Sequence, residues 1–456
     1  MKNILLVEPD YASRFPPLGL LKIGTYHKER GDNVQFVRGK IKDDTYWDRV
    51  YVTSLFSFQH RKTIDTILHY KKMVGNDLDR MFVGGIYASL YPGVIFRETG
   101  LFPHVGLLDK PGILGDDDVI VDSLIPDYSL LESVGYTYGL SDCYFGYATR
   151  GCPNRCRFCA VHLIEPDFVH YSGLYSYVDA IRQEYGEKQH LVLMDNNVLA
   201  SNEFDRIIGD IVRLGFHRGA RRNGRKRFVD FNQGVDASLI DREKAKALAS
   251  ICVEPLRLAY DSVKERRVFD RAVRYLGAEG LRDLSAYVLY NWEDGPADLY
   301  SRLRHCVELN SELDLYMYTF PMRFAPLDRV DRRHVGPLWT AREIRGLQCI
   351  LNVTKGLVSH RMDFFLRAFG ESPEEFLEII WMPDRYIVYR NTYEESAQSW
   401  RSTFRKLSES QLREFRDIVG RNDKSAMHRA YPKLRSRRVR RLVEAHLEES
   451  GCDGDE

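Results

Sequence analysis

Three cysteines lie close together in a chain of 456 residues that has eight cysteines in all. Cys152, Cys156 and Cys159 form a C-x3-C-x2-C pattern, whereas the other five are scattered. Closely spaced thiolates converge on a metal, and sulfur ligands select zinc or iron–sulfur clusters. Structural zinc takes four ligands, usually as two separated pairs, and no second pair follows here. The pattern therefore favours a [4Fe–4S] cluster in which one iron has no protein ligand; the alternative is three unrelated buried thiols.

This pattern, with Phe158 directly before the third cysteine, resembles the signature of the radical S-adenosylmethionine enzymes. The resemblance implies that S-adenosylmethionine binds the open iron through its amino and carboxylate groups. One electron from the cluster would then cleave it to methionine and a 5′-deoxyadenosyl radical. By the same resemblance, Phe158 lies against the adenine, and a flavodoxin or ferredoxin supplies the electron.

The helices and strands that must position the three cysteines form an alternating pattern. Between residues 136 and 325, apolar stretches alternate with amphipathic ones, which is typical of a parallel β/α layout. Strands are expected at 143–149, 191–194, 228–232, 256–260, 285–290 and 315–319. Six units suit the partial (β/α)6 barrel that the resemblance implies. Ligands of parallel barrels lie at the carboxyl ends of the strands, so the polar residues that follow each strand are candidate site residues.

Polar residues follow four of these expected strands. Asp195 and Asn196 come after the second, where the resemblance implies groups that bind the amino group of S-adenosylmethionine; the common Gly-Gly-Glu form is absent. Asn232 ends the third strand and could bind ribose hydroxyls or substrate. Asp261 ends the fourth, where the resemblance implies ribose or carboxylate binding, and Asn291 follows the fifth, beside the implied adenine site. For Asp195, Asn196 and Asn232, the alternative role is a helix cap or a turn.

The first 135 residues predict a separate doubly wound domain. Strands are expected at 2–7, 33–37, 49–55 and 80–84, with helices at 18–30 and 63–74 between them. Neither G-x-G-x-x-G nor G-x4-G-K-[ST] occurs, so the domain lacks the usual glycine-rich loops that bind nucleotide phosphates.

This domain resembles the cobalamin-binding domain that is joined to many radical S-adenosylmethionine proteins. The resemblance rests on Pro16-Pro17-Leu18-Gly19-Leu20-Leu21, then Thr53-Ser54-Leu55, then Val83-Gly84-Gly85. The D-x-H-x-x-G loop that supplies a histidine to cobalt is missing, and His27 is expected on the surface of a helix. Cobalamin binding therefore remains one interpretation, and a fold without the cofactor that shapes a substrate cleft is the other.

Residues 331–456 predict a mainly helical region, with helices at 342–351, 373–380 and 409–419 and short extended pieces at 381–383 and 386–389. The expected domains are thus 1–135, 136–330 and 331–456. No apolar run reaches the length of a membrane span, and the N-terminal apolar stretch is shorter than a signal peptide requires. We therefore expect a cytoplasmic protein without membrane contact.

Charge excludes bulk attraction to polyanions, since 66 Lys and Arg balance 65 Asp and Glu. Two basic stretches, 218–227 and 424–441, could still contact nucleic acid, or they could be ordinary solvated surface. The favoured function is hydrogen abstraction from an unknown substrate by a radical S-adenosylmethionine enzyme. The alternatives are a cobalamin-dependent methyltransferase of the same class and a non-catalytic iron–sulfur protein that binds nucleic acid. Methylthiolation of RNA is disfavoured because residues 1–142 contain no cysteine.

Overall fold

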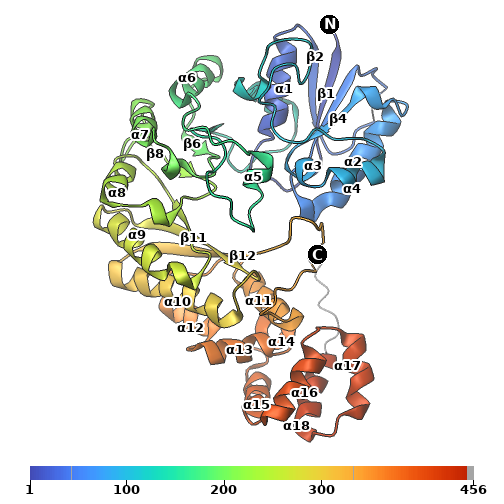
Figure 1. Ribbon diagram of the computed structural model, residues 1–456, viewed down its shortest axis with the longest axis vertical. Coiled ribbons are helices and arrows are strands. Elements are labelled where there is room, and N and C mark those ends of the chain that lie inside the picture. Colours follow the sequence, from blue (N-terminus) through green and yellow to red (C-terminus); the bar gives the residue numbers. More distant parts are fainter. Residues whose placement is uncertain (43, 332, 449–456) are drawn as a thin grey trace. The chain divides into compact units, whose positions relative to one another are not determined.

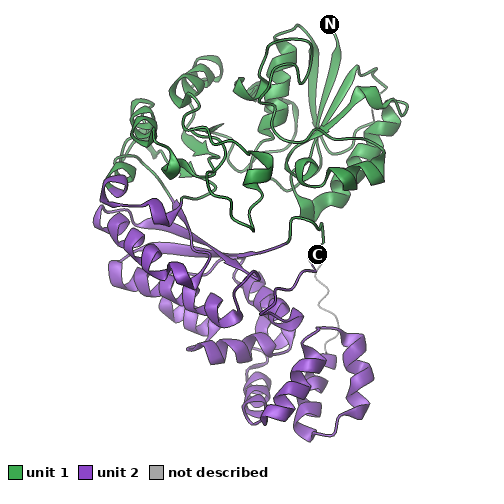
Figure 2. Ribbon diagram, in the orientation of Figure 1, with its two compact units in different colours: residues 1–235, 246–254, 326–332 green, residues 236–245, 255–325, 333–456 purple. Residues whose placement is uncertain are grey.

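The computed structural model describes residues 1–42, 44–331 and 333–448. The chain divides into two compact units, coloured separately in Figure 2. Unit 1 comprises residues 1–235, 246–254 and 326–332, and unit 2 comprises residues 236–245, 255–325 and 333–456. Unit 1 thus joins the N-terminal sheet to the cysteine motif, and the three-domain division remains a prediction.

Unit 1 begins with a four-stranded parallel sheet of order β2-β1-β3-β4. Its strands are β1 (Asn3–Glu8), β2 (Asn33–Arg38), β3 (Arg49–Thr53) and β4 (Met81–Gly84). Successive side chains of a strand point to opposite faces, so Ile4 and Leu6 pack with α1 (Leu18–Lys28). On the other face, Leu5 and Val7 pack with α2 (His60–Met73) and α4 (Pro92–Thr99). This arrangement, visible in Figure 1, confirms the doubly wound fold expected here.

A second parallel sheet completes unit 1, with the order β5-β6-β9. It consists of β5 (Cys143–Gly146), β6 (His190–Leu193) and β9 (Val229–Phe231). The short helix α5 (Val161–Ile164) and the longer α6 (Leu174–Tyr185) lie between the first two strands in sequence, and α7 (Phe204–Arg213) follows β6. The basic stretch before β9 contains a small antiparallel hairpin of β7 (Arg221–Arg222) and β8 (Arg225–Lys226).

Unit 2 holds a third parallel sheet, β10-β11-β12, made of β10 (Leu256–Ala259), β11 (Asp283–Tyr290) and β12 (Tyr316–Arg323). Helix α8 (Arg242–Ala249) precedes it in sequence, and α9 (Arg266–Ala278) and α10 (Pro296–Leu313) connect its strands. All six expected β/α strands therefore exist, as three in each unit. The partial barrel itself remains a prediction.

The C-terminal part of unit 2 is helical, as expected. Its helices are α11 (Ala341–Val353), α12 (Met362–Phe369), α13 (Pro373–Trp381), α14 (Asp384–Val388), α15 (Glu394–Arg405), α16 (Glu409–Val419), α17 (Lys424–Ala430) and α18 (Arg437–Leu447). The extended piece expected at 386–389 is wrong, because α14 occupies most of it. Pro383 caps this helix, and the Asp384 carboxylate pairs with Arg342 and Arg345. No described helix is both long and apolar enough for a membrane span.

Candidate functional site in unit 1

The three cysteines lie on the loop that leaves the carboxyl end of β5, where a parallel β/α layout places its ligands. Arg150 and Val169 close the base of this loop with two backbone hydrogen bonds of 3.1 and 2.9 Å. Inside it, the Cys159 amide donates to the Cys156 carbonyl at 3.0 Å. All three cysteines are half-buried, so the loop presents them on one short, closed segment.

Asp195, which follows β6, holds the beginning of this loop. Its carboxylate accepts hydrogen bonds from the Ala148 amide (3.0 Å), from the Thr149 amide and from the Thr149 hydroxyl (2.6 Å). The residue is only 1% exposed. Burial raises its pKa to about 6, against the opposing effect of these hydrogen bonds. Asp195 is therefore a positioning residue in this structure, whereas the resemblance implied contact with S-adenosylmethionine.

Glu165 holds the segment directly before Cys152. Its Oε2 accepts from the Gly151 amide at 2.7 Å and from Asn196 Nδ2 at 3.1 Å. Gly151 has φ +72°, and a Cβ there would lie 2.2 Å from the Asp167 carbonyl oxygen. Only glycine fits this turn. The turn therefore fixes the backbone conformation directly before Cys152.

Asn197 places an amide beside the first cysteine. Its Nδ2 lies 3.7 Å from Cys152 Sγ, and the residue is almost fully buried. Its Oδ1 meets no hydrogen-bond donor among the described residues. An N–H group near sulfur stabilises a thiolate, and hydrogen bonds to cluster sulfurs also tune reduction potentials.

The donor set fits a cluster better than a single ion. Among the described residues, no three His, Cys, Asp or Glu side chains approach closely enough to share one metal ion. In a [4Fe–4S] cube each thiolate binds a different iron, so the sulfurs stand farther apart than the ligands of one ion do. Three thiolates on one closed loop are the ligand number that a cube with one open iron takes.

Charges alternate along a series of buried and half-buried side chains that leads to the loop. Asp122 pairs with Lys22 at 3.2 Å and with Arg150 at 3.3 Å. Arg150 also lies 3.6 Å from Glu165 and stacks over the Tyr147 ring at 3.9 Å. Burial alone would raise the pKa of Asp122, but the two cations outweigh it and hold that pKa below its usual value.

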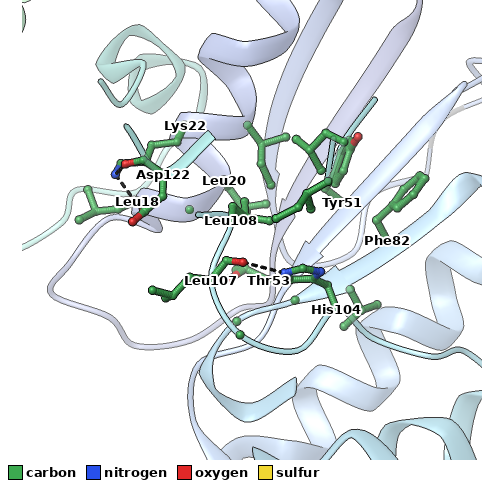
Figure 3. A pocket seen from close by; sticks show the side chains of 18 of the residues that line it. Leu18, Leu20, Lys22, Tyr51, Thr53, Phe82, His104, Leu107, Leu108 and Asp122 are labelled. Carbon is green, nitrogen blue, oxygen red and sulfur yellow. Dashed lines mark hydrogen bonds and ion pairs between the residues drawn. The ribbon is translucent and has the colours of Figure 1, made fainter. Parts of the chain in front are cut away.

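A cavity of about 290 Å³ opens at the carboxyl ends of β3 and β4 (Figure 3). Its walls are mostly apolar and come from α1, β3, β4 and the segment 104–114. Lys22 and Asp122 stand at one side of it, as Figure 3 shows. Tyr147 and Arg150 also line it, so the cavity contacts the chain just before the cysteine loop.

The two glycines at the end of β4 have different roles. A Cβ on Gly84 would meet nothing closer than 4.0 Å, at His104, so Gly84 leaves room in the cavity. Gly85 has φ +106°, and a Cβ there would lie 2.3 Å from the Ser54 carbonyl oxygen. Gly85 therefore permits close packing of β4 against the end of β3.

One histidine differs from expectation, and a second was not singled out in the sequence. His27 is buried and not on the surface: its Nδ1 lies 2.8 Å from Asp32 and its Nε2 lies 3.0 Å from the Tyr51 hydroxyl. Burial lowers its pKa. His104 lines the cavity with Nε2 3.0 Å from the Leu107 carbonyl, yet no motif in the sequence marks it.

The remaining candidates of unit 1 lie near the same strand ends. Phe158 is half-buried in the cysteine loop. Asn232 follows β9 and is half-buried; its Nδ2 lies 3.5 Å from Asp230, and its Oδ1 accepts from Gln233 at 3.2 Å. Asp230, a buried acid within β9, escaped the sequence reasoning because a three-residue strand shows too little alternation.

Asp261 and Asn291 belong to unit 2. Asp261 follows β10, and burial followed by the charge of Glu265 raises its pKa to about 6. Asn291 is fully buried: its Nδ2 donates to the Phe324 and His334 carbonyls at 3.2 Å, and its Oδ1 accepts from the Gly336 amide at 2.7 Å. Asn291 therefore anchors the loop after β12, and its place beside the adenine stays a prediction.

No protein-family model matches the chain, and no curated protein matches it. Among solved structures, the apo form of the cobalamin-dependent S-adenosylmethionine radical enzyme OxsB is similar over 98% of this chain and 78% of its own, at 13% identity and a TM-score of 0.46. Streptococcus suis SuiB bound to the precursor peptide SuiA is similar over 47% of this chain and 46% of its own, at 13% identity and a TM-score of 0.32. SuiB bound to S-adenosylmethionine is similar over 47% of this chain and 48% of its own, at 13% identity and a TM-score of 0.31.

Proposed function

We propose that this chain is a radical S-adenosylmethionine enzyme. The observation that carries the proposal is the three-cysteine loop at the carboxyl end of β5, anchored by Asp195 from the end of the adjacent strand β6. Cys152, Cys156 and Cys159 would hold the cluster. Its chemistry, when bound, is one-electron cleavage of S-adenosylmethionine, with an electron donor such as flavodoxin or ferredoxin.

The protein's own part is binding and orientation. Phe158 stands within the loop where it could lie against an adenine, and Asn196 is held beside the loop by Glu165. Asn232 is the further polar residue of unit 1 that we assign to S-adenosylmethionine or substrate, and Asp261 is, by itself, a candidate ligand-binding residue of unit 2. Asp261 has the raised pKa of a buried carboxyl group, which is a frequent property of functional sites.

Anaerobic reconstitution tests the proposal. The protein is loaded with iron and sulfide, reduced with dithionite and incubated with S-adenosylmethionine, and 5′-deoxyadenosine is measured by mass spectrometry. We expect product from the native chain and none from Cys156→Ala. Cys252→Ala is the matched control, because Cys252 is a half-buried cysteine of the same unit outside the motif. Undiminished cleavage in Cys156→Ala contradicts the proposal. A cluster without turnover favours the non-catalytic iron–sulfur protein instead.

A cobalamin-dependent methyltransferase is the second candidate, and the cavity beside β3 and β4 favours it. The cavity lies at the carboxyl edge of a doubly wound sheet, where such folds bind ligands. Its 290 Å³ is near the lower end of the range of about 300–1,000 Å³ for small-molecule pockets. We therefore expect the cavity to take at most one part of a cobalamin and not the whole molecule.

Retention of corrin separates the two candidates. The reconstituted protein is incubated with hydroxocobalamin, desalted, and its visible spectrum is recorded. Gly84→Leu places a side chain in the cavity without a left-handed backbone to strain, and Gly93→Leu adds the same side chain on the exposed side of α4. If the methyltransferase proposal holds, Gly84→Leu loses the corrin bands and Gly93→Leu keeps them. No corrin on the native chain contradicts this candidate and leaves the radical enzyme proposal untouched.

A further inference from the structure

The C-terminal helices carry a concentrated positive surface. It consists of six exposed side chains on α18 and the turn before it, and we call it the basic surface: Lys433, Arg435, Arg437, Arg438, Arg440 and Arg441. No acidic residue occurs in the whole stretch 424–441.

These six cations have no counter-ion in the part of the chain that the structure describes, since no carboxylate lies within 4.0 Å of any of them. The hairpin in unit 1 shows the opposite situation. There Arg225 lies 3.7 Å from Asp142, and Lys226 lies 4.0 Å from Glu254. The neighbouring Arg227 is buried and pairs with Glu187 at 2.7 Å. Among the described residues, four cations of the first basic stretch are therefore paired with carboxylates, whereas the six of the basic surface are not.

Three of the arginines are oriented by neutral acceptors. Arg438 donates to the Lys406 carbonyl at 3.0 Å, Arg440 to the Leu434 carbonyl at 2.6 Å, and Arg441 to the Ser399 hydroxyl at 2.8 Å. Such contacts hold each guanidinium in place and leave its charge intact. An oriented guanidinium loses less side-chain entropy when it binds an anion than a free one does.

The position of these arginines works against the helix that carries them. Arg437, Arg438 and Arg440 lie in the first turn of α18, whose N-terminus is capped by Ser436. The helix dipole makes this end positive, so each cation here destabilises the helix. Several cations at the N-terminal end of one helix oppose its dipole, and such repeated unfavourable placements occur at functional surfaces more often than at purely structural ones.

The buried apolar face of α18 argues against a lipid surface as the binding partner. Val439, Leu442 and Val443 are fully buried, and the helix packs against α15 and α16. A helix that lies on a membrane needs a free apolar face to insert into lipid, and α18 has none to offer. Arginine binds phosphate oxygens through a planar fork, and five of the six cations are arginine.

We propose that the basic surface binds the phosphodiester backbone of nucleic acid. The contact is with phosphates and not with bases, so it is independent of sequence and sensitive to salt. It rests on unit 2 alone and does not depend on the cluster proposed for unit 1.

Fluorescence anisotropy of the full-length protein tests this, with a labelled 20-nucleotide single-stranded RNA, a 20-base-pair DNA duplex, and anionic phosphatidylserine vesicles as separate arms. The test variant is Arg435→Ala/Arg437→Ala, since neither side chain makes a described hydrogen bond or ion pair. Its control is Arg267→Ala/Arg271→Ala, two exposed arginines of α9 without ion pairs. Thermal unfolding confirms that both variants fold.

We expect native binding to at least one nucleic acid, weakening steeply between 50 and 200 mM salt. Each lost phosphate contact lowers the slope of log K against log salt by about 0.7–0.9. The test variant should therefore lower that slope by about 1–2 and bind at least about fivefold more weakly, with the control unchanged. Preference for RNA or duplex identifies the source of the phosphates. Three results overturn the proposal: no binding to either nucleic acid, equal losses in both variants, or binding to vesicles alone.

Discussion

Asp195 holds Thr149 twice, through its backbone amide and through its hydroxyl at 2.6 Å. The two residues follow β6 and β5, which are neighbours in the same parallel sheet. The pairing of these strands therefore sets the direction in which the chain leaves β5 toward Cys152. The cysteine loop is positioned by the sheet and not only by its own sequence.

Replacing this carboxylate should disturb the loop. Asp195→Asn puts an amide N–H against backbone and hydroxyl donors, so one buried donor loses its acceptor. We expect a loss of about 1–3 kcal/mol in the free energy of unfolding, measured in urea, and less iron per chain after reconstitution. Asp205→Asn, on the exposed side of α7, is the control. A variant that keeps both native stability and native iron content contradicts the positioning role.

Gly85 should tolerate no side chain. In Gly85→Ala the new Cβ meets the Ser54 carbonyl oxygen at 2.3 Å on a backbone with φ +106°. We expect destabilisation of more than about 2 kcal/mol in urea unfolding. Gly93→Ala adds the same methyl group to exposed α4 and should change the stability by less than 1 kcal/mol in either direction. Equal stability of the two variants would show that β4 can move away from Ser54.

Asn291 combines a buried amide with a left-handed backbone of φ +68°. Asn291→Gly keeps that backbone free of strain but removes the hydrogen bonds to Phe324, His334 and Gly336. Asn291→Ala removes the same bonds and adds backbone strain. We expect about 2–4 kcal/mol of destabilisation for glycine and about 1 kcal/mol more for alanine. Limited proteolysis between residues 324 and 336 should accelerate in both; unchanged cleavage would refute the anchoring role.

His190 predicts a specific loss of stability in acid. Burial lowers its pKa to about 4, and Nδ1 accepts from the Phe228 amide at 3.2 Å while the ring stacks on Phe228. The unfolded chain binds a proton near pH 6.5, whereas the folded chain does so only near pH 4. The stability is therefore complete above pH 6.5 and falls as the pH drops toward 4.

The variant His190→Gln keeps an acceptor and cannot titrate. Between pH 7 and pH 5, the native chain should lose about 1–2 kcal/mol more than this variant, with allowance for partial exposure. Urea unfolding at the two pH values measures the difference. Other titrating groups act equally in both proteins, so parallel losses would mean that His190 is protonated in the folded state.

Periodicity predicted the elements well, and for a physical reason. The helix expected at 409–419 has the bounds of α16, because Ser408 and Gln411 form a capping box that marks its start. The partners of polar side chains were less predictable. His27 lies within a helix as expected, yet its partners Asp32 and Tyr51 come from outside that helix.

The same limit applies to the strand ends. A polar residue after a parallel strand can face a ligand or hold a neighbouring loop, and the sequence pattern is the same for both. Asp195 and Asn291 hold loops, whereas Asn232 and Asp261 remain candidates for ligand contact. The choice depends on which backbone groups the adjacent strand brings near, and these lie tens of residues away along the chain.

The hydrogen bonds at Gly151, Ala148 and Thr149 have a consequence for the maturation of the protein. They join the cysteine loop to Glu165 and Asp195 without any contribution from metal. Zinc fingers, by contrast, fold only when their ion binds. We therefore expect the polypeptide to fold without the proposed cluster, so that iron and sulfide would enter a loop whose backbone is already held in place. Chelators should therefore strip the cluster and leave a folded protein that can be refilled.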